Sequence, residues 1–168
     1  MANTFVKIAS VSLTGSGGFE FNSIPSTYTD LCLKISSRAT EASNTSALLM
    51  GFNGDTGANF NNRNIYGNGS TAASNSISNQ NFYVIGPFTS GSTSTSNTFG
   101  NAEIYIPNYA GSNQKSFSMD SVTENNGTAA EAYLQAGLWT GTAAINKIQI
   151  YRTCAQYTTA TLYGIKNS

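Results

Sequence analysis

Apolar residues in this chain recur at every second position in short runs, and turn-forming residues separate the runs. Leu48, Met50 and Phe52 share one phase, as do Ile104 and Ile106. Such alternation predicts half-buried β-strands, whereas helical periodicity is almost absent. The one helix candidate begins at residue 128, where alanines favour helix, although the alternating residues beyond it suit a strand equally. The pattern therefore predicts an all-β protein.

Turn chemistry divides the chain into segments of similar length. Asn53-Gly54, Asn68-Gly69 and Asn126-Gly127 are dipeptides favoured in tight turns. Strands are expected near residues 4–13, 18–22, 29–37, 47–53, 59–66, 81–88, 99–107, 116–124, 131–140, 145–151 and 157–165. This spacing predicts a single antiparallel β-sandwich over residues 1–168, with a jelly roll as the leading topology. The low-complexity segments 67–81 and 89–97 are expected to be long polar loops.

The composition combines a very polar chain with almost no charge. Ser, Thr and Asn supply 62 of the 168 residues, charged residues are 10%, and the net charge is zero. A disordered chain of low hydrophobicity normally has high net charge and few aromatics, but this chain has nine Phe, nine Tyr and one Trp. We therefore expect a folded domain whose charge does not attract nucleic acid or anionic membrane.

No targeting or membrane-spanning segment is recognisable in the sequence. The first residues lack a basic region followed by an apolar one, and no apolar run approaches about 18 residues. We expect a protein that is made in the cytoplasm and does not enter a membrane.

The sequence offers few side chains for catalysis, because the chain contains no histidine. This excludes Ser-His-Asp and Cys-His arrangements as well as histidine metal sites. Glu103 with Asp120 or Glu124 could form a glycosidase pair only if folding brings these carboxylates together. We expect no enzyme, no cofactor and no metal.

The segment 53–59 has oxygen-bearing residues at alternate positions around glycine, as calcium loops do. An EF-hand would have Glu at the twelfth position, where Asn64 stands, and helices on both sides. We favour a hairpin connection between strands that end at Phe52 and begin at Phe60.

The cysteines and the aromatic residues allow more than one role. Cys32 and Cys154 lie in apolar strands, where buried free thiols are commoner than a lone disulfide. Tyr66, Tyr83 and Tyr109 are candidate contacts to a ligand or partner, since a tyrosine ring can pack on a sugar. Among these, Tyr109 is expected to be the most exposed. Trp139 is expected in the core or in a subunit interface.

Three segments together resemble a family of small proteins of tailed bacteriophages. They are Thr4–Val11, the Ile-Pro-Ser-Thr-Tyr-Thr-Asp-Leu stretch within Phe21–Leu31, and Tyr157–Ser168 with Tyr-Gly-Ile-Lys. The resemblance extends from end to end and implies a virion structural component without catalytic residues. The alternation in the last segment also predicts that the final strand pairs with the first.

These observations lead to two functional hypotheses. The first is a capsid decoration or head-fibre protein, forming a homotrimer and binding the major capsid protein or another virion protein. The alternative is the distal receptor-binding domain of a tail fibre, which recognises host surface glycans through the polar loops.

Overall fold

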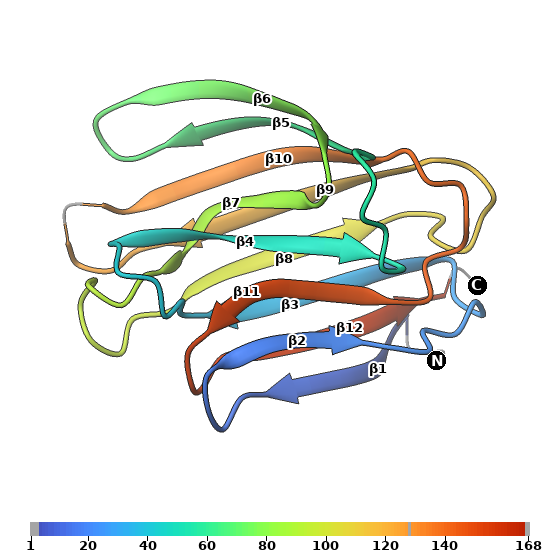
Figure 1. Cartoon of the computed structure of the whole chain (residues 1–168), viewed down its shortest axis with the longest axis horizontal. Coiled ribbons are helices and arrows are strands. Elements are labelled where there is room, and N and C mark those ends of the chain that lie inside the picture. The colour runs from blue at the N-terminus through green and yellow to red at the C-terminus, as the bar shows by residue number, and fades with distance from the viewer. Residues whose placement is uncertain (1–3, 128, 167–168) are drawn as a thin grey trace.

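The computed structural model describes residues 4–127 and 129–166, and within these ranges it contains strands and no helix. The expected all-β sandwich is confirmed (Figure 1). The twelve strands are β1 (Phe5–Ser12), β2 (Gly17–Phe21), β3 (Asp30–Ser37), β4 (Thr45–Phe52), β5 (Phe60–Gly67), β6 (Ala72–Gln80), β7 (Tyr83–Ser90), β8 (Gly100–Ile106), β9 (Lys115–Thr123), β10 (Glu131–Trp139), β11 (Ile148–Cys154) and β12 (Thr159–Ile165). All eleven expected strands occur, with ends displaced by at most three residues.

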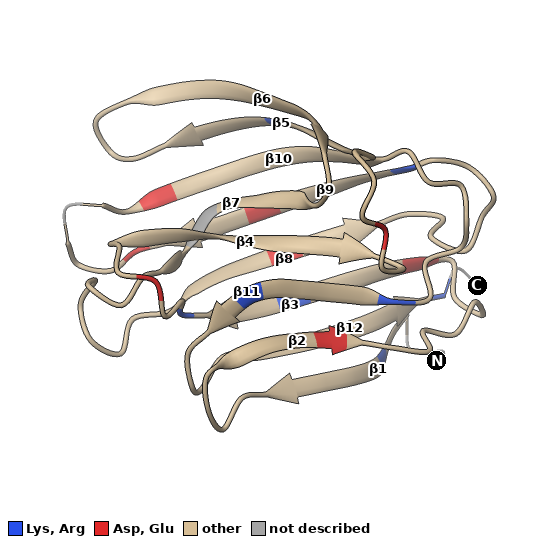
Figure 2. Cartoon of the chain, viewed as in Figure 1, with Lys and Arg blue, Asp and Glu red and all other residues tan. Residues whose placement is uncertain are grey.

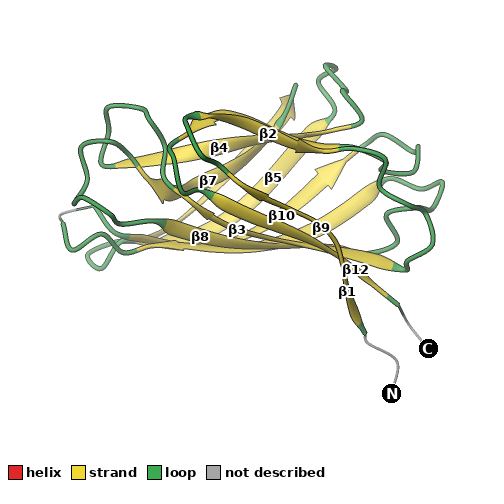
Figure 3. Ribbon diagram, turned by 90° about the horizontal axis from the view of Figure 1, so that it is seen from below, coloured by secondary structure: helices red, strands yellow, loops and turns green. Residues whose placement is uncertain are grey.

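The strands form two antiparallel sheets of unequal size, which lie face to face (Figure 3). The large sheet has eight strands in the order β1-β12-β3-β8-β9-β10-β5-β6, and the small sheet has four in the order β2-β11-β4-β7. The first and last strands pair as expected, from Phe5 opposite Ile165 to Ser12 opposite Thr159. The jelly-roll topology stays a prediction.

The core lies between the sheets and is continuous along the sandwich. Every second residue of β9 points into it, which is the burial pattern that the alternation predicts. An aromatic cluster fills its centre: the Phe52 ring lies 5.6 Å from the rings of both Phe117 and Trp139, and 5.8 Å from that of Phe60. Trp139 is therefore a core residue, which was one of the two expected positions, the other being a subunit interface.

Two expectations about local structure are wrong. Most of the expected loop 67–81 is strand β6, which pairs with β5 after a turn at Asn68-Gly69. The alternation is weak there because β6 is an edge strand, and only Ala73, Ile77 and Gln80 are even half-buried. The segment 53–59 is no hairpin either, since it joins β4 of the small sheet to β5 of the large one.

The helix candidate falls partly on residue 128, which lies outside the described residues. From Glu131 onwards the segment is strand β10, paired on one side with β9 and on the other with β5. The strand interpretation of this segment is confirmed.

The second expected loop is real and is fixed in place by one arginine. Residues 91–99 connect β7 to β8, whereas Thr89 and Ser90 belong to β7. Arg38 donates hydrogen bonds from Nη1 to the carbonyl oxygens of Thr95 (2.9 Å) and Thr98 (3.0 Å), and from Nη2 to those of Ser92 (3.3 Å) and Ser94 (3.0 Å). The planar guanidinium thus replaces the backbone partners that a loop lacks.

Side-chain amides bond to the backbone of β7, one of the two edge strands of the small sheet. Gln135 accepts a hydrogen bond from the Gly86 amide (2.9 Å) and donates one to the Val84 carbonyl (3.4 Å), while Asn62 also donates to Val84 (3.2 Å). Asn62 and Gln135 belong to the large sheet and are buried. They satisfy backbone groups of β7 that would otherwise lack a neighbouring strand.

Candidate functional site

The three tyrosines predicted as contacts do not form one site. Tyr109 was expected to be exposed, but it is fully buried and its hydroxyl donates to the Pro25 carbonyl. The reason is the turn after β8, where Asn108 takes a positive φ of 50° and directs the next side chain inward. Tyr83 is also buried, 4.7 Å from the Phe117 ring, and burial raises the pKa of its hydroxyl. Tyr66 alone of the three keeps exposed surface.

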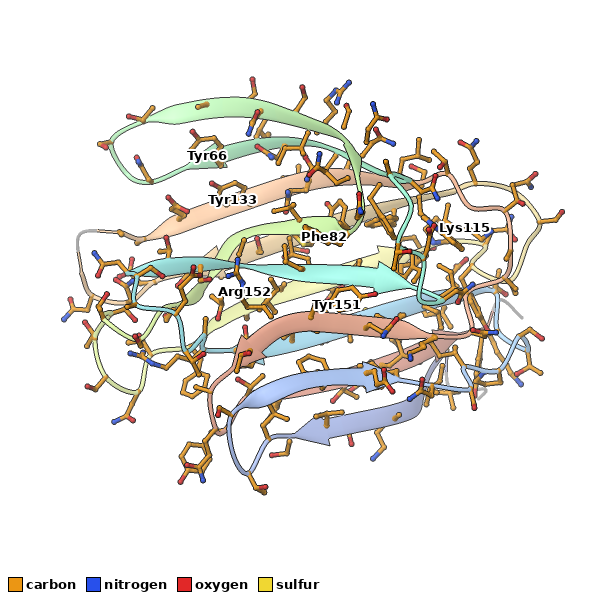
Figure 4. The ribbon with its side chains drawn as sticks, viewed as in Figure 1. Tyr66, Phe82, Lys115, Tyr133, Tyr151 and Arg152 are labelled. Carbon is orange, nitrogen blue, oxygen red and sulfur yellow. The ribbon has the colours of Figure 1, made fainter. Side chains whose placement is uncertain are left out.

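Tyr66 stacks on Tyr133, its direct cross-strand partner, with ring centroids 4.9 Å apart and planes 9° apart. Both face the small sheet but lie beyond its edge strand β7, so that no strand covers them in Figure 4. Burial raises the pKa of the neighbouring Glu131, a shift that its hydrogen bond with Tyr133 partly offsets. Tyr133 also packs closely over Gly86, where an added Cβ would lie 2.8 Å from its ring.

The carboxylates considered for catalysis lie on the opposite, outer face of the large sheet. Glu103 and Asp120 are direct cross-strand partners, so the structure brings these two together. Glu124 follows the end of β9. Glu103 pairs with Lys34 at 2.8 Å from Nζ to Oε2, and both side chains are about half exposed. The absence of catalysis stays a prediction.

In the calcium-like segment 53–59, the Asp55 carboxylate that could bind a cation forms hydrogen bonds within the protein instead. The Asp55 carboxylate accepts hydrogen bonds from Trp139 Nε1 (2.6 Å), from the Gly57 amide (2.8 Å) and from Asn59 Nδ2 (2.9 Å). Burial alone would raise the pKa of Asp55, but these hydrogen bonds outweigh it and the pKa is lowered. The segment therefore links the two sheets around the core tryptophan.

Two further properties concern metals and membranes. Among residues 4–127 and 129–166, no three His, Cys, Asp or Glu side chains gather as a metal site would require. Within the same ranges, there is no helix with the length and apolar character needed to cross a membrane.

Cys32 and Cys154 are both buried free thiols, which confirms the commoner of the two expected states.

The outer face of the large sheet carries an exposed apolar cluster. Ile65, Val122 and Leu134 are 59%, 41% and 56% exposed. Ile65 and Leu134 are direct cross-strand partners on β5 and β10, and Val122 lies on the adjoining strand β9. We call these three residues the apolar ridge. Exposed apolar side chains that are contiguous are typical of interaction surfaces.

A hollow lies on each side of the Ile65–Leu134 pair. One measures about 780 Å³ and is bordered by Ser76, Ser118 and Ala136, and the other measures about 730 Å³ and is bordered by Ala72 and Ala132. Small side chains line both hollows, which leaves the Ile65–Leu134 pair standing above them.

The ridge region is almost free of charge. Arg63 borders the first hollow and Asp120 the second, and no other charged side chain lines either. Figure 2 shows that charges are sparse on β5 and β10 and absent from β6. The Arg63 guanidinium donates a hydrogen bond from Nη1 to the Asn62 carbonyl at 3.1 Å. Within the described part of the chain, neither Arg63 nor Asp120 has an ion-pair partner.

The sequence contained a signal for the ridge that composition and alternation alone did not reveal. Phe60 and Trp139 point into the core and fix the phase of β5 and β10. On that phase the inward positions include Asn64 and Gln135, whereas the aliphatic residues between them point outward. Strands usually turn aliphatic side chains inward and polar ones outward, and β5 and β10 do the reverse at these positions. Aliphatic side chains exposed in this way are typical of interaction surfaces.

Comparisons with protein-family models and with curated proteins find no match to this chain.

Proposed function

We propose that this chain is a structural protein of a bacteriophage particle, a capsid decoration or head-fibre protein held in place by protein–protein contacts. The observation that carries the proposal is the apolar ridge, whose side chains are 41–59% exposed on a sheet face with two charged residues at its borders. A surface of this kind suits close contact with another protein. It offers little to an anionic polymer.

Other features agree with display at high density on a particle. The net charge is zero and the exposed polar residues are largely Ser, Thr and Asn, so that neighbouring copies would not repel one another. The 91–99 loop is held by Arg38. The proposal includes the homotrimer, contact with the major capsid protein or another virion protein, and synthesis in the bacterial host cytoplasm. The resemblance to phage proteins supports the same assignment.

The test uses particles assembled without the protein. Purified protein should bind them at a fixed number of copies per particle and raise their resistance to heat or denaturant, since binding favours the assembled state. Leu134→Asp should reduce the number of bound copies. Ser10→Asp, which places the same charge on the same face at the far end of the sheet, should not. Protein found only at tail tips, or absent from purified particles, would contradict the proposal.

The alternative is a receptor-binding domain of a tail fibre, and one observation favours it. Tyr66 retains exposed surface on the part of the large sheet that the small sheet does not cover. Aromatic rings in such positions can pack on the apolar face of a sugar. Excess purified protein should then block adsorption to host cells, and Tyr66→Ala should lose this effect while Tyr157→Ala, an exposed tyrosine elsewhere, retains it.

A further inference from the structure

We propose that the outer face of the small sheet carries a binding site for a neutral oligosaccharide, with the Tyr151 ring as the surface on which one sugar ring stacks. Tyr151 lies on β11, between β2 and β4, and is 43% exposed (Figure 4). The inference goes beyond the proposed function, because attachment to a particle needs no sugar. The site is also separate from the apolar ridge and from Tyr66, which both belong to the large sheet.

The Tyr151 ring lies along the surface of the sheet. It leans back across Gly51 of β4, where an added Cβ would lie 2.7 Å from both Cε2 and Oη of the tyrosine. The hydroxyl donates a hydrogen bond to Gln149 Oε1 at 3.2 Å, which holds the ring in this direction. One face of the ring therefore rests on the strand and the other is turned to solvent, as stacking on the apolar face of a pyranose requires.

Glycines on the two neighbouring strands keep the ring accessible. Gly51 lies beneath it on β4, and Gly18 lies on β2, on the other side of β11. An added Cβ at Gly18 would lie 2.8 Å from the Ile150 carbonyl oxygen and 3.9 Å from that of Arg152, so Gly18 is level with Tyr151. Neither glycine has a side chain that would cover the ring, and a ligand can therefore reach its open face.

A row of polar side chains continues from the ring hydroxyl and is held together by its own hydrogen bonds. Gln149 donates one to Glu20 Oε2 (3.4 Å), and Asn22 donates one to Glu20 Oε1 (2.8 Å). Lys147 Nζ lies 2.9 Å from Glu20 Oε2, and both side chains are partly exposed. These amide, ammonium and carboxylate groups keep further donors and acceptors. A flat ring bordered by such groups matches a sugar, which has an apolar face and a rim of hydroxyls.

The charges around the ring favour a neutral sugar over an acidic one. Two cations are close to Tyr151 in the chain, and each is already paired with a carboxylate. Lys147 pairs with Glu20, and Arg152 Nη1 lies 3.2 Å from Glu41 Oε2. An acidic sugar would meet no net positive charge here and would have to compete with these carboxylates. A neutral sugar leaves both ion pairs intact.

The test follows the backbone amides by two-dimensional nuclear magnetic resonance while cellotetraose, maltotetraose or chitotetraose is added, with tetragalacturonate as the acidic comparison. At least one neutral tetrasaccharide should shift the signals of Gly18, Gly51 and Gln149, and the acidic one should not. Tyr151→Ala should weaken the binding by about tenfold or more, because the stacking surface is lost. Tyr157→Ala, at a tyrosine that is 70% exposed on the turn before β12, is the matched control and should bind as the wild type does.

A second variant separates sugar stacking from the packing of a side chain on Gly51. In Tyr151→Leu, an apolar side chain still covers the glycine, which helps to stabilise a sheet, but the flat ring is gone. This variant should unfold at a urea concentration close to that of the wild type and should lose binding as Tyr151→Ala does.

Four results would overturn the inference: no shift with any of the three neutral tetrasaccharides, equal shifts with tetragalacturonate, binding that survives in Tyr151→Leu, or binding that is lost in Tyr66→Ala instead. The proposed function is tested independently. A protein that binds particles but no tetrasaccharide would leave the proposed function standing and remove the sugar site, and the reverse result would do the opposite.

Discussion

At the scale of single residues, the Asp55 carboxylate links the connection between the sheets to the buried Trp139. Asp55→Ala should remove the acceptor of the 2.6 Å hydrogen bond and leave the indole N–H without a partner inside the protein. Loss of a hydrogen bond to a charged acceptor typically lowers the free energy of unfolding by about 1.5–3 kcal/mol. Urea denaturation at neutral pH, followed by the fluorescence of the single tryptophan, measures this loss.

The same carboxylate should make stability depend on acid. Because the pKa of Asp55 in the folded state lies below its ordinary value of 3.8, its contribution is fully present above that value and is lost as the pH falls through the folded pKa. Asp55→Ala should therefore lose less stability than the wild type between neutral pH and pH values below 3.8. Glu124→Gln, at an exposed carboxylate, is the control and should follow the wild type. An equal acid sensitivity of Asp55→Ala and wild type would contradict this role.

Tyrosine positions illustrate what residue types alone could and could not predict. Tyr109 resembled Tyr66 in the sequence, since each stands beside an asparagine or glycine turn, whereas Tyr83 stands in an apolar run with Phe82 and Val84. Tyr83 is drawn inward by the phase of β7 and Tyr109 by the backbone of a turn. The φ angle of an asparagine cannot be read from local composition, so the burial of Tyr109 was not predictable, whereas the apolar neighbours of Tyr83 already favoured the core.

At the scale of elements, Arg38 should determine the order of the 91–99 loop. Arg38→Met removes the donors to four loop carbonyls while keeping much of the aliphatic stem. We expect faster amide hydrogen exchange at Ser94 and Thr98, whose N–H groups bond to Gly91 and Thr95 within the loop. Nuclear magnetic resonance would measure the exchange residue by residue.

The effect should be confined to this element. Protection of the β3 and β12 amides should change little, because their ladder does not pass through the guanidinium. Lys34→Met removes a cation that is ion-paired on the outer face and should leave the loop protected as in the wild type. Unchanged exchange of Ser94 and Thr98 in Arg38→Met would show that the loop is ordered by other contacts.

Strands were predictable wherever one face is apolar, and less so elsewhere. The alternation located β4, β8 and β9 because each has a buried face of large side chains. It missed β6, an edge strand that pairs through its backbone and needs no such face. The apolar ridge was also not predicted. Ile65 is exposed because the alternate residues of β5 face the small sheet, and the sequence does not say which set of alternate residues does so.

At the scale of the whole molecule, the sandwich should unfold as one cooperative unit. The core is continuous between the sheets, and the pairing of β1 with β12 ties the two ends of the fold together. Trp139 fluorescence, which reports the core, and circular dichroism, which reports the strands, should give coincident urea transitions. Refolding should take milliseconds to seconds, as is typical of proteins dominated by pairings distant in sequence. Two separate transitions would indicate that the large and small sheets unfold independently.

Overall architecture was accessible from sequence because it depends on many weak signals that agree. Eleven of the twelve strands and the pairing of the last strand with the first followed from residues spread over the whole chain. The division into sheets of eight and four strands did not, because it depends on contacts between distant segments that leave no local pattern. The same holds for Glu103 and Asp120, whose proximity follows from the pairing of β8 with β9.

The amides that close the edge of β7 have a further consequence, for the handling of the protein at high concentration. Asn62 and Gln135 stand where an additional strand would have to bind, so strand exchange or fibril growth through this side of the small sheet must first displace buried hydrogen bonds. The free edge of β6 has no such protection and contains neither charge nor proline. If the protein aggregates on storage or overexpression, it should do so from the large sheet, and a lysine introduced on β6 should be the effective remedy.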